Sequence, residues 1–210
     1  MRVRDYFLYS FAIFYLFIGL TAIFNTIEIG NVNGILWLCY MSLFMLSIGM
    51  FLQDDGLIIS QLNLLIIPLL LWNIDFFSYF ILSSQTLLGI TNYMFIPGNT
   101  VGKLVGLQHV ITIPLSLLAL YFMPIKSIHS WRISFVQVAS LFLVTLMLTP
   151  EESNINYVYK LGFSESFNNS FYPLYWFSSI FIIVVLTNYC IVYLMKKTHP
   201  NFMKGSARKK

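Results

Sequence analysis

Two ionisable side chains, Asp75 and His109, lie inside segments that are otherwise almost entirely apolar. A charged group in such a segment is costly and normally faces a partner or a water-filled cavity. A carboxylate bonded to an imidazole fixes the tautomer of the ring and raises its basicity, as in general bases and proton relays. The sequence therefore makes Asp75 and His109 the candidate catalytic pair. The structural alternative is an Asp that caps a helix and a His that bonds a backbone carbonyl.

A stripe of polar residues continues from His109 along the same predicted helix. His109, Thr112 and Ser116 are spaced by three and four residues, which places them on one helix face. Pro114 lies in the same helix, where it removes a backbone donor and leaves the Val110 carbonyl free. A kinked helix with a polar stripe suits the wall of a cavity, and hydrogen bonding between packed helices is the alternative.

The segment from Thr149 to Lys160 is the third polar feature, dense in side chains that donate or accept hydrogen bonds. It follows an apolar segment directly, so we expect it to fold over the mouth of a helix bundle, with an ordinary solvated loop as the alternative. The candidate ligand-binding residues are Trp72, Tyr93, Thr112, Asn154, Asn156 and Tyr157. No Cys and His spacing is typical of a metal site and no glycine-rich phosphate loop is present, so no metal or cofactor is expected.

The composition indicates what positions these residues. Of the 210 residues, 58% are hydrophobic and 10% are charged, whereas soluble domains carry roughly 25% charged residues. The charges leave uncharged stretches as long as the roughly 20 residues that cross a bilayer. Backbone polar groups must be paired inside lipid, which favours helices, and the short alternating segments of a β-barrel are absent. We expect an all-α, six-transmembrane-helix bundle.

Turn residues divide the sequence into six predicted spans that form one membrane domain over residues 1–210. The spans are 6–27, 35–52, 57–80, 104–123, 133–149 and 171–194, and residues 195–210 form a basic tail. Asp75 and His109 each lie five residues from the same end of their spans, about 7.5 Å deep at 1.5 Å per residue. Because one connection joins these two spans, we expect them to pack as neighbours with the pair within reach.

Lysine and arginine predict the orientation. With the N-terminus in the cytoplasm, ten of the twelve basic residues lie on the cytoplasmic side, and only Lys103 and Lys160 lie outside. Such an excess marks the cytoplasmic side of a membrane protein. We therefore expect both termini in the cytoplasm and Asp75, His109 and the 149–160 segment on the outer side. Basic clusters beside spans serve orientation, so no nucleic-acid partner is expected.

Two further sets of residues carry structural predictions. Cys39 and Cys190 lie at depths that differ by about 13 Å at 1.5 Å per residue, too far apart for a disulfide, so we expect both to be free. Polar residues in the cytoplasmic halves of three spans are predicted to hydrogen-bond between helices, with a polar path through the membrane as the alternative. These residues are Ser60, Gln61, Asn63, Gln137 and Asn188.

Four segments together resemble a group of small bacterial membrane proteins of unknown function. They are Trp72 to Phe77, Gly89 to Phe95, His109 to Pro114 and Asn154 to Val158. The resemblance covers roughly Trp72 to Lys160. It implies a location in the cell inner membrane and transfers no activity.

A more distant resemblance is to the androgen-induced-gene family of lipid hydrolases, six-helix membrane enzymes that use a Thr nucleophile and a His. The segment from His109 to Leu115 is similar to the family's His segment, and Ser60 to Asn63 is similar to its nucleophile segment, with Ser in place of Thr. The order of the helices differs from that family. Ser60 and His109 are predicted near opposite faces of the membrane, about 20 Å apart, so Ser60 is not assigned as a nucleophile.

Three functions are compatible with these features. The first is binding or transport of a small polar molecule or lipid headgroup in an outward-facing pocket lined by the residues above. The second is an intramembrane lipid hydrolase or transferase in which Asp75 orients His109 and the nearest hydroxyls are those of Thr112 and Thr91. The third is an accessory subunit whose polar loop docks a partner. The expected partners are membrane lipids and a small polar ligand, with a second copy of the chain or another membrane protein as the alternative.

Overall fold

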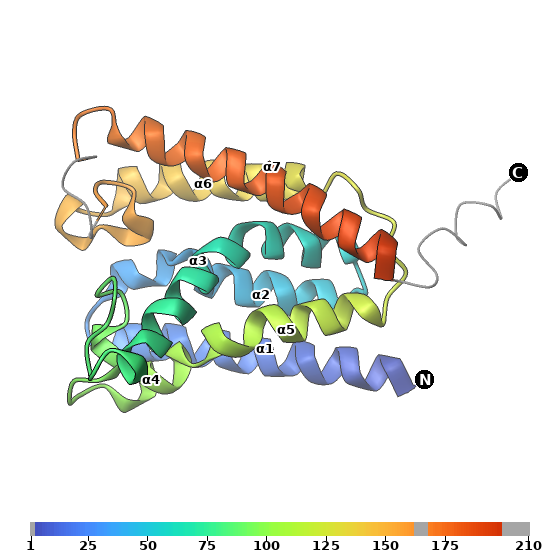
Figure 1. Ribbon diagram of the computed structural model, residues 1–210, viewed down its shortest axis with the longest axis horizontal. Helices are drawn as coiled ribbons and strands as arrows, with labels where there is room; N and C mark the ends of the chain where they lie inside the picture. The colour runs from blue at the N-terminus through green and yellow to red at the C-terminus, as the bar shows by residue number, and fades with distance from the viewer. Residues whose placement is uncertain (1–2, 162–167, 199–210) are drawn as a thin grey trace, which may run out of the picture.

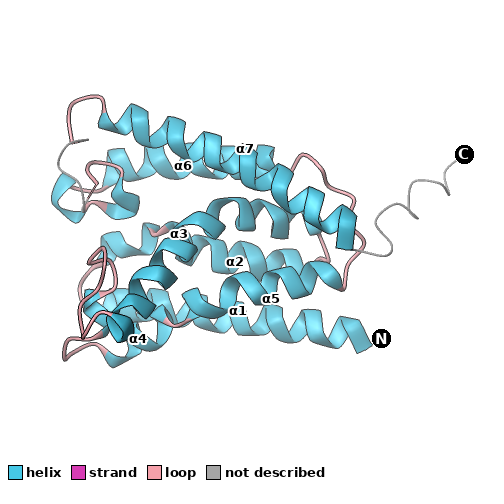
Figure 2. Ribbon diagram, viewed as in Figure 1, coloured by secondary structure: helices cyan, strands magenta, loops and turns pink. Residues whose placement is uncertain are grey.

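The computed structural model describes residues 3–161 and 168–198, and this part of the chain is helical with no strand (Figure 2). The helices are α1 (Val3–Glu28), α2 (Leu38–Phe51), α3 (Asp55–Ile81), α4 (Thr100–Gly106), α5 (Gln108–Tyr121), α6 (Trp131–Leu148) and α7 (Tyr172–Thr198). Short 3-10 segments are η1 (Val32–Leu36), η2 (Asn92–Met94), η3 (Glu151–Ser153) and η4 (Ile155–Tyr157). The predicted all-α bundle is confirmed.

Five helical segments of the described chain are long and apolar enough to cross a membrane. They are α1, α3, the α4–α5 segment, α6 and α7. The predicted span 35–52 corresponds to α2, which is not among these five. This helix has 14 residues and is about 21 Å long, shorter than the roughly 30 Å of a bilayer core. Large apolar side chains such as Phe17 and Phe24 on α1 are 68% exposed. A helical bundle with an apolar surface is a membrane-embedded protein.

Three predicted boundaries differ from the structure. The predicted span 104–123 is two helices, because α4 ends at Gly106 and α5 begins at Gln108. The predicted span 35–52 starts as the 3-10 segment η1, and the α-helical part begins only at Leu38. The last helix continues to Thr198, into the predicted basic tail. The rest of that tail, 199–210, lies outside the described residues, as do residues 162–167.

Helix α3 is the centre of the bundle (Figure 1). It packs against α2, α5, α6 and α7, while α1 packs against α2, α4 and α5. Apolar residues of α1, α2, α3 and α5 form the main core, among them Leu8, Leu46, Ile58, Leu62 and Leu120. In Figure 1, α1 begins and α7 ends at the same end of the bundle, here called the basic end. The opposite end, here called the long-loop end, carries residues 82–99, 149–161 and 168–171.

Hydrogen bonds between side chains join α3 to α6 and α7 in the half of the bundle nearer the basic end. Gln61 and Gln137 exchange two amide hydrogen bonds, of 2.8 and 3.1 Å. Asn63 Nδ2 donates to Asn188 Oδ1 and to Ser134 Oγ, both at 3.2 Å. The predicted hydrogen bonding between helices is therefore confirmed for these residues. Both cysteines, Cys39 and Cys190, are free, as predicted.

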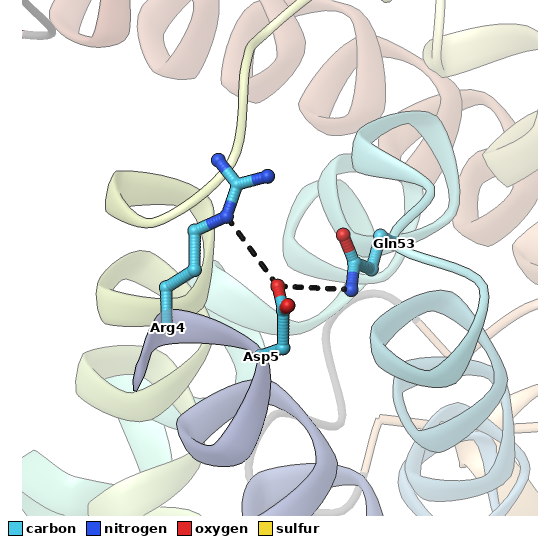
Figure 3. Close-up of polar contacts among 3 residues, drawn as sticks. All are labelled: Arg4, Asp5 and Gln53. Carbon is cyan, nitrogen blue, oxygen red and sulfur yellow. Dashed lines mark hydrogen bonds and ion pairs between the residues drawn. The ribbon is translucent and has the colours of Figure 1, made fainter. Parts of the chain in front are cut away.

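At the basic end, α1 is held to the turn between α2 and α3 (Figure 3). Asp5 Oδ1 accepts from Arg4 Nε at 3.4 Å and from Gln53 Nε2 at 3.5 Å. The carboxylate also lies in the first turn of α1, where the helix dipole favours negative charge. The bond to Gln53 therefore links the start of α1 to the turn between α2 and α3.

Candidate functional site

Asp75 lies on α3 and holds the loop that follows this helix. Its carboxylate is fully buried. Oδ1 accepts from the backbone N–H of Leu88 at 2.5 Å, and Oδ2 accepts from the N–H and the hydroxyl of Thr91 at 2.7 and 2.8 Å. Backbone donors directed at a carboxylate stabilise its charged form. The Asp75 carboxylate therefore caps backbone groups of the loop. A capping role is the structural alternative that the sequence left open for this residue.

A second side chain of α3 supports the same loop. Ser78 Oγ accepts from the N–H of Leu87 at 2.9 Å and donates to the carbonyl of Asp75 at 2.6 Å. The chain reverses here through Ser83 and Ser84, both in the left-handed region with φ of 52° and 69°, which non-glycine residues rarely adopt. The bonds from Asp75 and Ser78 hold this turn in place.

His109 lies in the first turn of α5, beside the break between α4 and α5. Its Nδ1 lies 2.7 Å from the carbonyl oxygen of Gly106. Because a carbonyl only accepts, Nδ1 carries the proton, and Nε2 of the neutral ring is an acceptor. The ring stacks on Trp72, with 4.8 Å between ring centroids. The backbone carbonyl of His109 accepts from Asn73 Nδ2 at 3.0 Å. The imidazole is therefore held by one hydrogen bond and one stacked ring, and Nε2 has no hydrogen bond within the described part of the chain.

The predicted hydrogen-bonded pair of Asp75 and His109 is not formed. The carboxylate takes the loop donors of Leu88 and Thr91, and Nδ1 of the imidazole takes the Gly106 carbonyl. The prediction was wrong because the imidazole stacks on Trp72, about one helix turn from Asp75 along α3. The loop after α3 supplies the donors that the carboxylate bonds instead.

Trp72 and Tyr93 complete the surroundings of His109. Trp72 Nε1 donates to the hydroxyl of Tyr93 at 3.3 Å. A Cβ on Gly106 would lie 2.9 Å from that hydroxyl, so the glycine allows η2 to approach the helix break. Burial raises the pKa of Tyr93 to about 12, against a lowering by the Trp72 hydrogen bond. Tyr93 is therefore a neutral phenol at physiological pH. The structure brings Trp72, Tyr93 and His109 together, as the sequence predicted.

Thr112 faces α1 and belongs to a different polar row. Its hydroxyl lies 2.6 Å from Gln108 Oε1 and 2.7 Å from the Gln108 carbonyl. Tyr15 of α1 donates to the Thr112 carbonyl at 3.0 Å, and its hydroxyl lies 3.2 Å from Ser116 Oγ. The predicted polar stripe is thus partly packing between α1 and α5. Its first member is Gln108, which the sequence analysis missed, although its spacing of four from Thr112 marks it.

Half of the Gln108 amide has no hydrogen-bond partner. The residue is 2% exposed, and Nε2 has no hydrogen bond within the described part of the chain. Turning the amide over would only exchange the unpaired donor for an unpaired acceptor, since one end alone reaches Thr112. Five other buried side-chain atoms of the described residues also lack a partner: Ser42 Oγ, Asn63 Oδ1, Ser130 Oγ, Trp131 Nε1 and Thr145 Oγ1. A buried unpaired polar group requires an explanation, such as a bound molecule.

The loop at 149–161 is ordered by its own asparagines. Asn156 Oδ1 accepts from the N–H of Leu38 at 2.7 Å, and its Nδ2 donates to the carbonyl of Leu36 at 2.8 Å. Asn154 closes the loop on itself through the backbone of Tyr159 and Lys160. The two side chains predicted to bind ligand are therefore used within the chain. The loop does fold onto the bundle, as predicted.

Tyr157 is the third predicted ligand-binding residue of this loop. Burial raises its pKa, and the charge of Asp75 raises it further. Its backbone is in the left-handed region with φ of 56°, and its carbonyl accepts from the Tyr172 hydroxyl at 2.8 Å. Its ring meets Trp37 edge to face at 5.9 Å. Backbone strain of this kind persists only where the surroundings hold it, and it gathers at functional sites.

The role of Asn156 is testable with two substitutions. Asn156 has φ of 56°, so Asn156→Gly removes the two hydrogen bonds without adding backbone strain, whereas Asn156→Ala removes them and adds roughly 1 kcal/mol of strain. We expect faster amide hydrogen exchange at Leu38 in both variants, with the Ala variant less stable to heat. Unchanged exchange at Leu38 in Asn156→Gly would show that the Asn156 side chain does not hold the loop to the start of α2.

Comparisons of the chain with family models, with curated proteins and with solved structures found no match. The function must therefore be argued from the geometry. Among the described residues, no group of three or more His, Cys, Asp or Glu side chains gathers as a metal site would require.

Proposed function

We propose that this protein binds a small polar molecule or a lipid headgroup in the long-loop half of its bundle, beside Gln108 and His109. It does so as a six-span protein of the cell inner membrane with both termini in the cytoplasm. In this role the protein holds the molecule without transporting or converting it. The main support is the unpaired half of the buried Gln108 amide.

The six-span topology is supported by length and by charge. The 3-10 segment η1 has five residues and adds about 10 Å at 2.0 Å per residue. Together with α2, it matches the roughly 30 Å of a bilayer core. An even number of crossings agrees with α1 beginning and α7 ending at the same end of the bundle (Figure 1). The basic residues Arg4, Lys126, Arg132 and Lys196 at that end favour the cytoplasmic side.

The unpaired half of the Gln108 amide supports a ligand. An amide group buried without a partner costs roughly 1–3 kcal/mol, and the membrane supplies no water to satisfy it. A ligand with a hydroxyl, carbonyl or phosphate group would accept a hydrogen bond from this amide. The imidazole of His109 follows in the same turn of α5, on the side that faces Trp72 of α3.

Binding is favoured over catalysis because the expected catalytic partners are occupied. Asp75 and the Thr91 hydroxyl bond each other. The Thr112 hydroxyl bonds Gln108. His109 is thus left without an orienting carboxylate and without either hydroxyl that the sequence offered. Stacking on Trp72 and the bond to Gly106 suit a rigid binding group.

Binding is favoured over transport because polar side chains near the basic end bond one another. Gln61, Asn63 and Asn188 are fully buried and bond across α3, α6 and α7. These bonds use groups that a polar path would need free. The accessory-subunit function has less support, since the asparagines of the loop are used within the chain.

The test is retention of ligand by substituted protein. His109→Phe keeps a ring against Trp72 and removes Nε2, and Gln108→Leu removes the amide. We expect each variant to retain at least about fivefold less of the bound molecule, the equivalent of one hydrogen bond of about 1 kcal/mol. Protein is reconstituted in vesicles of phosphatidylethanolamine and phosphatidylglycerol and re-extracted. Native mass spectrometry then measures bound lipids and water-soluble molecules.

The matched control is His129→Phe, because His129 is exposed at the opposite end of the bundle. We expect it to retain as much as the parent protein. Thermal midpoints of all variants show that the bundle is folded. Equal retention by the parent, His109→Phe and Gln108→Leu would overturn the proposal.

A further inference from the structure

The hydroxyl of Thr112 makes two short contacts with Gln108. Thr112 Oγ1 lies 2.7 Å from the backbone carbonyl oxygen of Gln108 and 2.6 Å from the end of its side-chain amide. Both distances are as short as a full hydrogen bond between oxygen atoms, which has a length of about 2.7–2.8 Å. Each contact therefore needs a hydrogen of its own, because two oxygen atoms this close repel when no hydrogen lies between them.

The number of hydrogens decides the orientation of the Gln108 amide. A threonine hydroxyl has one hydrogen and a carbonyl oxygen has none. With Oε1 against Thr112 Oγ1, that one hydrogen must serve both the backbone carbonyl and Oε1. With the amide turned by 180°, the hydroxyl donates to the backbone carbonyl and Nε2 donates to Oγ1. Both contacts then have a hydrogen, so the turned amide is favoured.

The orientation of the amide determines which chemical group pairs with its free end. With Nε2 free, the site takes an acceptor such as a phosphate or carbonyl oxygen. In the turned amide the free end is Oε1, which accepts and does not donate. Gln108 is 2% exposed, so this oxygen is buried away from water. The group that pairs with Oε1 must therefore carry an N–H or O–H hydrogen.

The charges in the long-loop half of the bundle agree with a donor and not with an anion. Asp75 is fully buried there, and uncharged donors of the following loop bond its carboxylate. Lys103 is the basic residue nearest to Gln108 in the sequence, and its side chain bonds the carbonyl of Ile96. In a medium of low dielectric constant, a buried negative charge stabilises a cation and repels an anion. An ammonium group therefore suits this half of the bundle better than a phosphate.

We propose that the ligand of this protein is a lipid whose headgroup donates a hydrogen bond to Gln108 Oε1, through an ammonium or a hydroxyl group. The inference rests on the proposed function and names the chemistry of the same site. Gln108 lies within the candidate membrane span Thr100–Tyr121, so the lipids of the bilayer are the molecules beside it. Headgroups without an N–H or O–H donor, such as that of phosphatidylcholine, are excluded.

Pairs of lipids that differ in their donors test this assignment. Phosphatidylethanolamine has N–H donors that phosphatidylcholine lacks, and phosphatidylglycerol has hydroxyl donors that phosphatidylmethanol lacks. Protein is reconstituted in vesicles of one equimolar pair with identical acyl chains and re-extracted, and native mass spectrometry measures the retained lipids. In at least one pair, we expect the donor lipid to be retained at least about fivefold more than its partner, the equivalent of one hydrogen bond of about 1 kcal/mol. Equal retention within both pairs would overturn the assignment.

Substitutions at Gln108 separate an acceptor from a donor. Both side-chain oxygens of Gln108→Glu accept, so we expect the preference for the donor lipid to be kept. A site that donates to phosphate would instead lose both lipids of each pair in this variant, through charge repulsion. In Gln108→Leu we expect equal retention within each pair. Gln137→Leu is the control and should keep the preference, because the amide of Gln137 is paired with Gln61 inside the protein.

Thermal midpoints close to that of the parent show that the variants are folded. The ratio in the parent protein decides alone if Gln108→Glu does not fold. The proposed function fails separately. Unchanged total retention in Gln108→Leu would overturn binding at this site, whereas lower total retention in this variant, with no preference in the parent, would overturn only the donor chemistry of the ligand.

Discussion

Asp75→Ala is expected to lower the free energy of unfolding by about 3 kcal/mol and to release the loop after α3. The substitution leaves two backbone donors and the Thr91 hydroxyl without their acceptor, at a site that is fully buried. Hydrogen bonds to a charged group contribute roughly 1.5–3 kcal/mol each, and they are not additive within one network. Chemical unfolding in detergent micelles measures the change, and proteolysis within 82–91 reports the loop.

Two further variants separate the hydrogen bonds of Asp75 from a general loss of stability. Thr91→Val removes one of the three bonds and leaves the backbone bonds in place, so we expect a loss of about 1 kcal/mol. Glu151→Ala removes an exposed carboxylate at the same end of the bundle and serves as the control. If Asp75→Ala were as stable as Glu151→Ala, the carboxylate would not be holding the loop.

Asn188→Leu is expected to lower the free energy of unfolding by about 2 kcal/mol. Asn188 Oδ1 accepts from Asn63 and from the N–H of Trp131, and Nδ2 donates to the carbonyl of Ile128. Hydrogen bonds between helices in membranes average about 0.6 kcal/mol and reach about 1.7. Leucine fills a similar volume, so the measurement isolates the three lost bonds.

Thr145→Val is the matched control for Asn188→Leu. Thr145 is also fully buried, but its hydroxyl has no hydrogen-bond partner among the described residues. Removing such a group leaves no partner behind, so we expect no loss of stability or a slight gain. Equal losses in the two variants would show that packing, and not the hydrogen bonds of Asn188, carries the effect.

The helices were predictable because a membrane span is marked by a continuous uncharged run in the sequence. The predicted spans agree with α1, α3, α6 and α7 to within a few residues. The break at Leu107 was missed because no proline marks it. Gly106 precedes the break, and a Cβ there would meet Tyr93 and Met94 of η2, which only the fold brings to this place.

The candidate site was predictable only in part. Trp72, Tyr93 and His109 meet as expected, since they lie near the same end of neighbouring elements. The partners of Asp75 were hidden, because they are backbone donors of Leu88 and Thr91, and a backbone N–H has no sequence signature. Asn156 bonds Leu36 and Leu38, contacts that require the whole bundle to form. Depth in the membrane predicts the level of a side chain, but not its direction.

The most direct measurement of ligand binding is an experimental density map of the protein in nanodiscs of its native lipids, at a resolution that shows side chains. We expect non-protein density within hydrogen-bond distance of the unpaired end of the Gln108 amide. The same density should be absent from Gln108→Leu. A map in which both ends of the amide bond protein atoms, with no other density there, would contradict the account.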